Sequence, residues 1–242
     1  MRPDRPAGNA FGGACGAFGA ATAVLTLLLT PTASPAPMAP AAVSVTGRVA
    51  MVDAEARGAE DVGQTVVWLE RAGLPAPVPV TARVANERKQ FTPRVLVVPA
   101  GSTVAFANHD PFDHNVFSST EGSVFDLGLY GRGETRDARL SRPGVVRVYC
   151  NVHAQMSAVV VVRDGPHYTM AASDGSFTLP AVAPGRYVLH AWHERAPEAA
   201  LPVRVGAGGL ADVVVRLDAR GWRPKPHLNK FGRPYPKPRR RY

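Results

Sequence analysis

The segment VYCNVHAQM, residues 148–156, brings three metal-binding side chains close together in the sequence. Cys150 lies three residues before His153, and His153 lies three residues before Met156. A copper ion that alternates between its +1 and +2 states needs ligands that suit both, which are a soft thiolate, imidazole nitrogens and a weak thioether. Because one short segment supplies each of these donor types, it predicts part of a copper site.

Two other interpretations of this segment were weighed against copper. Zinc could bind the same cysteine and histidine, but methionine is a poor zinc ligand. Without any metal, Cys150 would be a buried thiol that acts as a small apolar side chain beside incidental histidines. A binuclear copper centre is disfavoured because it needs two cysteines in one loop, and this loop has one. The combination of donors at this spacing favours a single copper ion.

The N-terminal residues have the pattern of a secretory signal. Arg2 and Arg5 give a basic start, residues 17–29 are apolar, and Ala39-Pro40-Ala41 offers a small-residue cleavage site, so the mature chain would begin near residue 42. The apolar stretch is too short and too rich in glycine and alanine for a comfortable membrane span, although an uncleaved anchor remains an alternative. We therefore expect export to the periplasm.

Export makes the remaining thiol informative. The chain has two cysteines, and Cys15 would be removed with the signal, which leaves Cys150 as the only thiol of the mature protein. Thiols in an exported protein normally oxidise or pair, and Cys150 has no internal partner. We therefore expect that a metal ion holds Cys150 as its thiolate.

The remainder of the sequence predicts an all-β protein. Its 23 prolines and 23 glycines interrupt valine-rich runs too often for long helices, and they indicate short strands joined by turns. Turn signals occur at Pro99–Ser102 and Ser141–Gly144. The strand-like runs are residues 43–52, 64–70, 93–98, 102–110, 114–117, 134–140, 144–150 and 158–163.

A second imidazole must come from elsewhere in the chain, because a loop of this length cannot surround an ion alone. His114 is the best candidate. It opens a predicted strand 36 residues before Cys150. The segment between them holds at least two strands, enough to return the chain to the same end of a β-sandwich.

The stretch VPAGSTVAFANHDPFDHNVF, followed by VYCNVHAQM, resembles the cupredoxin family over roughly residues 77–163. Its C-x-x-H-x-x-M loop is similar to that of amicyanin and shorter than that of plastocyanin. The resemblance implies a Greek-key β-sandwich with one mononuclear type 1 (blue) copper ion. It also implies that His114, Cys150 and His153 form a trigonal ligand set and that Met156 makes a long axial contact.

The same resemblance suggests roles for two neighbouring residues. Asn115 matches a position whose backbone or side chain steadies the cysteine sulfur. Tyr149 precedes the cysteine and could lie along an electron path.

Five further histidines lie outside this set, and we expect no site at His167, in a turn, or at His227, in the tail. His109 departs from the family pattern, and it could be a surface residue, a pH-sensitive neighbour of the site or an alternative ligand; we favour the surface. His190 and His193 are an odd number of residues apart, so on one strand they would face opposite ways. We expect no site there.

Residues after 164 resemble a carboxypeptidase regulatory-like domain, a small β-sandwich. Asp174–Leu179 and Ala183–Tyr187 match the second half of its pattern, and Val45–Val49 with Val66–Leu69 match the first half. The predicted domain organisation is a signal peptide (1–41), first strands of the regulatory-like sandwich (42–72), an inserted cupredoxin domain (73–163), the remainder of that sandwich (164–219) and a basic, proline-rich tail (220–242).

The positive charge of the chain is concentrated in this tail. Residues 220–242 hold nine cations and no acid, which equals the formal net charge of +9, so the folded body is close to neutral. The close-spaced prolines predict an extended, disordered segment. It could steer the protein toward an acidic redox partner or toward anionic lipid headgroups, whereas nucleic acid is not expected as a partner of an exported chain.

These features favour a periplasmic blue-copper protein that carries single electrons between redox partners. We expect no enzyme activity, because the sequence shows no substrate-pocket signature and no ordered Ser/His/Asp set. The alternative function is copper binding or delivery in the cell envelope, which rapid loss of copper to a chelator would favour. A structural adhesion role with a vestigial site is a third, weaker alternative.

Overall fold

The computed structural model describes residues 41–53 and 61–236, so most of the expected signal segment lies outside the described residues. Within these ranges the chain forms strands and one short 3-10 turn, Val62–Gln64, which confirms the all-β prediction. The described residues include no helix with the length and apolar character needed to cross a membrane.

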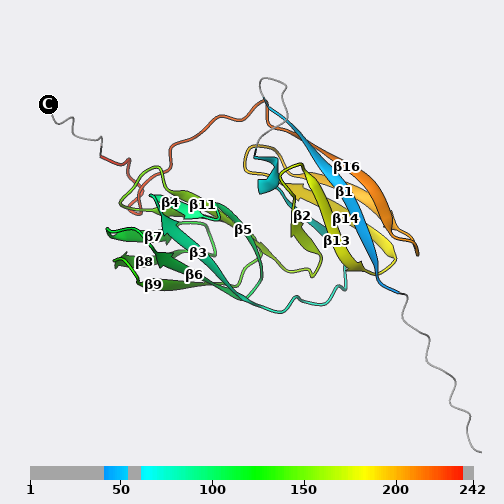
Figure 1. The fold of residues 1–242 in the computed structure, drawn as a ribbon, viewed down its shortest axis with the longest axis horizontal. Coiled ribbons are helices and arrows are strands. Elements are labelled where there is room, and N and C mark those ends of the chain that lie inside the picture. Colours follow the sequence, from blue (N-terminus) through cyan, green and yellow to red (C-terminus); the bar gives the residue numbers. More distant parts are fainter. Residues whose placement is uncertain (1–40, 54–60, 237–242) are drawn as a thin grey trace, which may run out of the picture. The chain divides into compact units, whose positions relative to one another are not determined.

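A β-sandwich from the middle of the chain carries the predicted metal ligands, and we call it the central sandwich. One sheet has the strand order β5-β11-β10-β7-β8 and the other has β4-β3-β6-β9. Parallel pairs of distant strands, β5 with β11 and β3 with β6, give each sheet crossover connections. Its strands, green in Figure 1, are β3 (Thr81–Glu87), β4 (Gln90–Thr92), β5 (Val95–Pro99), β6 (Ser102–Asn108), β7 (His114–Ser118), β8 (Phe125–Tyr130), β9 (Thr135–Leu140), β10 (Gly144–Cys150) and β11 (Ser157–Arg163).

The alternating pattern of β10 decides which way Cys150 points. Successive side chains of a strand face opposite sides of its sheet. Val146, Val148 and Cys150 are therefore on one side, and all three are buried in the core of the central sandwich. Arg147 and Tyr149 lie on the other side, where Arg147 is exposed and Tyr149 is half-buried. The predicted turn at Pro99–Ser102 is confirmed, with Gly101 in the left-handed conformation at φ 85°.

A second sandwich is built from strands on both sides of the central one in sequence, and we call it the terminal sandwich. Its sheets have the orders β13-β1-β16 and β12-β2-β14-β15. Strands β1 and β16 pair in parallel and lie side by side in Figure 1. The strands are β1 (Val43–Val52), β2 (Val66–Glu70), β12 (Tyr168–Met170), β13 (Ser176–Val182), β14 (Gly185–Trp192), β15 (Ala199–Val205) and β16 (Leu210–Asp218).

Strand pairings join residues 43–70 to residues after 164. Strand β1 pairs with β13, and β2 pairs with β12 and β14. We retain the predicted domain boundaries as a proposal that these pairings support.

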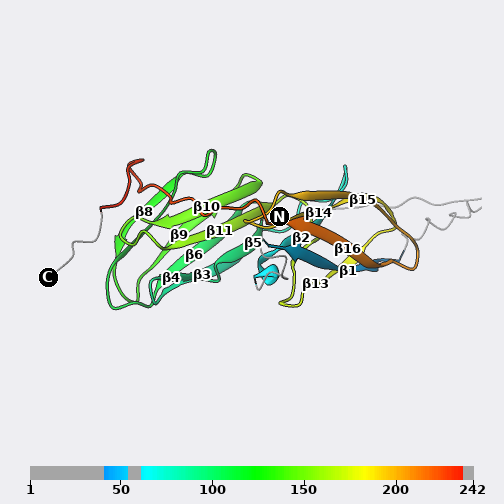
Figure 2. The same cartoon turned by 90° about the horizontal axis from the view of Figure 1, so that it is seen from above.

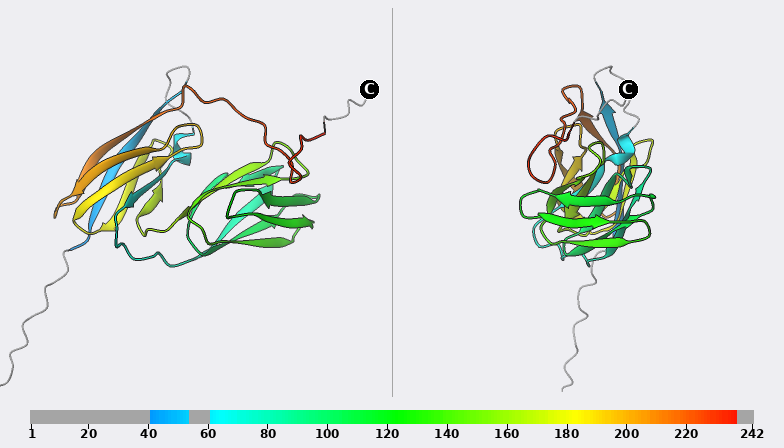
Figure 3. Two further views of the ribbon diagram at one scale, coloured as in Figure 1. Left: turned by 180° about the vertical axis from the view of Figure 1, so that it is seen from behind. Right: turned by 90° about the vertical axis from the view of Figure 1, so that its left-hand side faces the viewer.

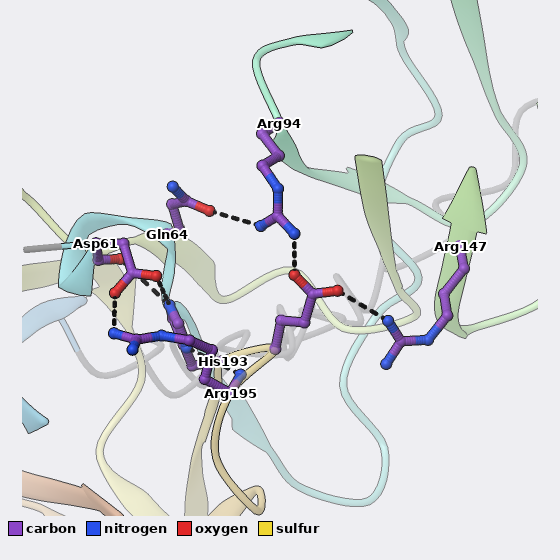
Figure 4. A network of polar contacts seen from close by, with 7 residues as sticks. Asp61, Gln64, Arg94, Arg147, His193 and Arg195 are labelled. Carbon is purple, nitrogen blue, oxygen red and sulfur yellow. Dashed lines mark hydrogen bonds and ion pairs between the residues drawn. The ribbon is translucent and has the colours of Figure 1, made fainter. Parts of the chain in front are cut away.

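Polar contacts around Glu194 link strands from both sandwiches (Figure 4). The Glu194 carboxylate accepts hydrogen bonds from the guanidinium groups of Arg94 and Arg147. Nearby, Arg195 pairs with Asp61, and His193 lies 3.2 Å through Nε2 from the Asp61 carbonyl oxygen. Beside these contacts a small apolar cluster is buried, made of Val66, Trp68, Val95, Val159, Val161 and Trp192.

After β16 the described part of the tail, residues 220–236, contains no strand or helix, although a disordered segment was expected and this part makes defined contacts. It runs back from the end of β16 to the central sandwich, as the red segment of Figures 2 and 3 shows. Its contacts there were not foreseen from the sequence.

Candidate metal centre

Cys150 ends β10, so its thiol lies at the edge of the sandwich core and not in its middle. The side chain is fully buried, and it is the free cysteine of the described residues. The chain then turns through residues 151–156 and returns as β11, with the Met156 N–H donating to the His153 carbonyl and the Cys150 N–H donating to the Met156 carbonyl. This tight turn folds the loop back over the sulfur.

The structure brings two of the predicted histidines to this sulfur. Nδ1 of His114 lies 3.6 Å from Cys150 Sγ, and Nδ1 of His153 lies 3.7 Å from it. One ligand atom from each of the three residues lies within 4.8 Å of the other two. His114 opens β7, which pairs beside the end of β10 through Val116 and Cys150. The sheet therefore closes the 36-residue separation between them.

Met156 lies in the same buried cluster as Cys150. Its side chain is almost completely buried, and it packs in the apolar core that also contains Val148. Its backbone is tied to Cys150 and His153 by the two hydrogen bonds of the loop. The thioether is thus held on the core side of the loop.

The donor types fit copper better than other common metal ions. A thiolate and two imidazoles suit both oxidation states of copper, and a buried thioether nearby adds a soft fourth donor. The three closest donors surround one point, whereas the shell contains no carboxylate that would favour a hard cation such as Mg²⁺ or Ca²⁺.

Asp110 forms a hydrogen bond with the edge of the His114 ring that faces away from Cys150. Its carboxylate lies 2.9 Å from His114 Nε2, on the opposite edge of the ring from the sulfur. It also accepts the backbone N–H groups of Arg88 and Lys89, at 2.7 and 2.9 Å. Both residues adopt left-handed backbone conformations, with φ of 53° and 58°, which is uncommon for residues other than glycine. The turn at 88–89 is therefore shaped to present two donors to this buried carboxylate.

These contacts set the protonation of the metal-free site. Burial alone would raise the pKa of the Cys150 thiol, but hydrogen bonds from His114 and from backbone N–H groups, including that of Asn115, outweigh it and lower the pKa. Burial alone would lower the pKa of His114, but its contacts with Cys150 and Asp110 raise it. For His153, burial and the neighbouring cations lower the pKa.

Asn115 contacts both the sulfur and the neighbouring strand. Its backbone N–H bonds to the Cys150 thiol, and its carbonyl accepts the Asn151 N–H at 2.9 Å. The side-chain amide donates to Asp126 at 2.5 Å and to the Gly128 carbonyl at 2.9 Å.

The site has one side that is nearer to solvent. His153 is half-buried, whereas His114 and Cys150 are fully buried. The Phe112 ring packs against both imidazoles, with ring centroids 5.4 Å from His114 and 5.3 Å from His153. Access to the centre is therefore easiest at His153.

The other histidines considered do not join the group. His109 is exposed, which agrees with the surface interpretation, although its neighbour Asp110 is part of the site. His190 stacks on Trp68 and bonds to Glu198, and His193 is buried beside Asp61.

The sequence analysis missed Asp110 and the tail residue Tyr235, whose hydroxyl donates to the Cys150 carbonyl at 2.7 Å. Asp110 lies in the loop before His114, where no periodic pattern marks it. Tyr235 is 85 residues from Cys150 and has no local signal.

Comparisons with known proteins agree with this chemistry. The sequence model of the copper binding proteins of the plastocyanin/azurin family matches residues 78–163. Plastocyanins from Ulva arasakii and Ulva pertusa are each 34% identical to the chain over 73 residues, a span that covers 26% of this chain and 74% of the relative.

Three solved structures are also similar. A purple cupredoxin from Nitrosopumilus maritimus shares 23% identity, over 34% of this chain and 99% of its own, with a TM-score of 0.31. A Cu(I) amicyanin mutant shares 20%, over 34% of this chain and 82% of its own, with a TM-score of 0.32. A copper-containing nitrite reductase from Thermus scotoductus shares 26%, over 39% of this chain and 25% of its own, with a TM-score of 0.34.

Proposed function

Because the chain belongs to the plastocyanin/azurin family of copper-binding proteins, with copper as its cofactor, we propose that it carries single electrons between redox partners. The proposed site is one type 1 copper ion held by His114, Cys150, His153 and Met156. The observation that carries this proposal is the convergence of a buried thiol and two imidazoles, whose donor atoms lie within 4.8 Å of one another.

The protein's part in this function is to hold the donors in place. Bound copper would supply a one-electron couple between its +1 and +2 states, and this ligand set suits both states. The β-sandwich fixes Cys150 and His114 on paired strands, and Asp110 fixes the second edge of the His114 ring. A rigid shell limits rearrangement between the two states, which favours fast electron exchange. We propose the half-buried His153 as the electron port.

We further propose that the protein is exported to the periplasm and is not an enzyme. Its redox partner would be acidic, and the basic residues of the tail would attract it. The same charges would also attract anionic lipid headgroups. The support is the concentration of nine cations in residues 220–242.

The test is reconstitution of the mature chain, from residue 42 onward, with Cu(II). We expect an intense visible thiolate-to-copper band and reversible reduction, because the Cys150 sulfur would bind the metal directly. Cys150→Ala should lose the band while still folding, and Cys15, removed with the signal, cannot substitute for it.

Two results would contradict this function. Wild-type protein that binds cupric ion without the band would exclude the proposed ligand set. A band together with rapid loss of copper to a competing chelator and poor redox cycling would instead indicate copper delivery.

A further inference from the structure

The described tail has a defined conformation near its end. The Asn229 side-chain oxygen accepts the backbone N–H groups of Phe231 and Arg233, at 3.0 and 3.1 Å. The Asn229 N–H donates to the Arg233 carbonyl, and Gly232, with φ 71°, donates to the Asn229 carbonyl. An asparagine whose side chain bonds to the following backbone stabilises a turn without help from a sheet. This turn places Lys230 and Tyr235 on the same stretch of the central sandwich.

Tyr235 contacts the backbone of the cysteine that ends β10. Its hydroxyl donates a hydrogen bond of 2.7 Å to the Cys150 carbonyl oxygen. A carbonyl at the end of a strand has no further ladder partner on that side, and the phenol supplies one.

Lys230 contacts two residues close to Cys150, Asn151 and Asp126. Its backbone N–H donates to the Asn151 side-chain oxygen at 3.0 Å, and its Nζ lies 2.7 Å from the Asp126 carboxylate. Asp126 in turn accepts from the Asn115 amide, and the Asn115 carbonyl accepts the N–H of Asn151, the residue after Cys150. One tail residue is therefore connected to the end of β10 through β8 and β7.

His227 covers the outward face of β10. Its ring stacks on Tyr149 with centroids 4.0 Å apart and an interplanar angle of 18°, and the Tyr235 ring meets the other side at 5.2 Å. Since Tyr149 points away from the core, the tail covers part of the residue next to Cys150, which is half-buried.

We propose that three tail residues, His227, Lys230 and Tyr235, set in place by the turn at Asn229, are positioning residues of the metal centre: they hold the strand end that carries Cys150 and cover Tyr149. This rests on the proposed copper function for its effect on the metal. The consequence for docking is that the Tyr149 side of the site is closed by the chain itself. A partner would then meet the centre from the His153 side.

The attachment can be tested on the metal-free protein with trypsin. Between residues 220 and 236, trypsin can cut only after Arg220 and Lys230, because Arg223, Lys225 and Arg233 each precede proline. In the attached tail, both the Lys230 N–H and its Nζ are bonded. Tyr235→Phe removes one hydrogen bond, and we expect cleavage after Lys230 to become about three- to tenfold faster.

Two further variants sharpen this test. Asn229→Ala, which breaks the turn without touching Cys150, should also accelerate cleavage, and it replaces Tyr235→Phe if that variant does not fold. Leu228→Ala is the matched control, since this tail side chain is 49% exposed, and it should cleave like the wild type. Equal cleavage rates in all four proteins would overturn the attachment.

Positioning of the metal ligand is tested separately on the copper-loaded protein. Tyr235→Phe should shift the thiolate-to-copper band and the reduction potential, whereas Leu228→Ala should leave both unchanged. An unaltered band and potential in Tyr235→Phe would overturn the positioning role. If the wild type shows no band at all, the copper function fails, while the trypsin result still decides whether the tail is attached.

Discussion

At the scale of single residues, the centre depends on a carboxylate that contacts one ligand only. The Asp110 side chain is buried, and its carboxylate forms hydrogen bonds with two backbone N–H groups and with His114 Nε2. Burial would raise its pKa, but these hydrogen bonds outweigh burial and lower it, so the carboxylate is ionised. A negative charge on the far edge of a ligand imidazole fixes the ring orientation and raises the basicity of the ligand.

Asp110→Asn tests this arrangement. The amide has nearly the same size but no negative charge, so we expect a higher reduction potential, because the carboxylate favours the more positive oxidation state of copper. The free energy of unfolding of the metal-free protein should fall by about 1–3 kcal/mol, since one buried donor loses its acceptor. Redox titration and urea unfolding measure the two effects.

Asp113→Asn is the matched control for this substitution. Asp113 lies directly before His114 in sequence, but its carboxylate is exposed to solvent. The reduction potential and the free energy of unfolding should therefore stay at the wild-type values. A potential for Asp110→Asn equal to that of the control would show that the Asp110 charge does not act on the site.

At the scale of elements, the terminal sandwich depends on close packing around β1. This strand lies between β13 and β16 in a three-stranded sheet. A Cβ at Gly47 would lie 2.2 Å from the Val213 carbonyl oxygen and 2.7 Å from the Phe177 ring. The absence of a side chain at Gly47 is therefore what lets the first and last strands of the described chain approach each other.

Gly47→Ala should lower the free energy of unfolding by about 1–3 kcal/mol, because backbone and a buried ring must move to admit one methyl group. Thermal or urea unfolding measures this loss. Gly208→Ala is the control, since an added Cβ there meets no atom within 4 Å and φ is not in the left-handed region. Equal stability of the two variants would contradict the tight packing of β1.

At the scale of the whole molecule, charge is distributed unevenly between the neutral body and the basic tail. Several tail cations have local partners: Lys230 pairs with Asp126, and Arg220 pairs with Asp218. Arg223 and Lys225 line a pocket of about 660 Å³ together with Tyr149 and His227. These two cations therefore lie on the outward side of β10, in the pocket that Tyr149, the residue before Cys150, also lines.

This placement predicts how reduced protein reacts with an anionic oxidant. Hexacyanoferrate(III) should oxidise it more slowly as ionic strength rises, because opposite charges attract over roughly a Debye length of about 10 Å at 0.1 M salt. The double variant Arg223→Gln/Lys225→Gln should react about threefold more slowly at low salt. Stopped-flow absorbance of the copper band measures the rate.

The control for this prediction removes the same charge elsewhere. Arg204→Gln/Arg216→Gln takes two exposed cations from strands β15 and β16 of the terminal sandwich, and it should change the rate much less. If both double variants slow oxidation equally, net charge governs the encounter and the tail has no special role.

The sequence by itself was enough to propose the ligands of the copper site. Cys150, His153 and Met156 are close in sequence at the end of an alternating strand, so local spacing was enough to predict donors of the right type on one loop. The run GVVRVYC also predicted a strand that ends at Cys150, and β10 is that strand. Turn residues and proline content were enough to predict an all-β fold.

Only the tertiary structure decided which distant groups support that site. Asp110 was overlooked because an acid beside a histidine in a loop has no periodic signal, and its role depends on two backbone N–H groups from the turn at 88–89. Tyr235 and Lys230 follow many prolines, a composition typical of free tails, yet each finds a partner on the central sandwich. The local sequence pattern of a strand predicts which of its side chains face the core. A contact between residues 85 positions apart depends instead on which surfaces of the folded chain pack together.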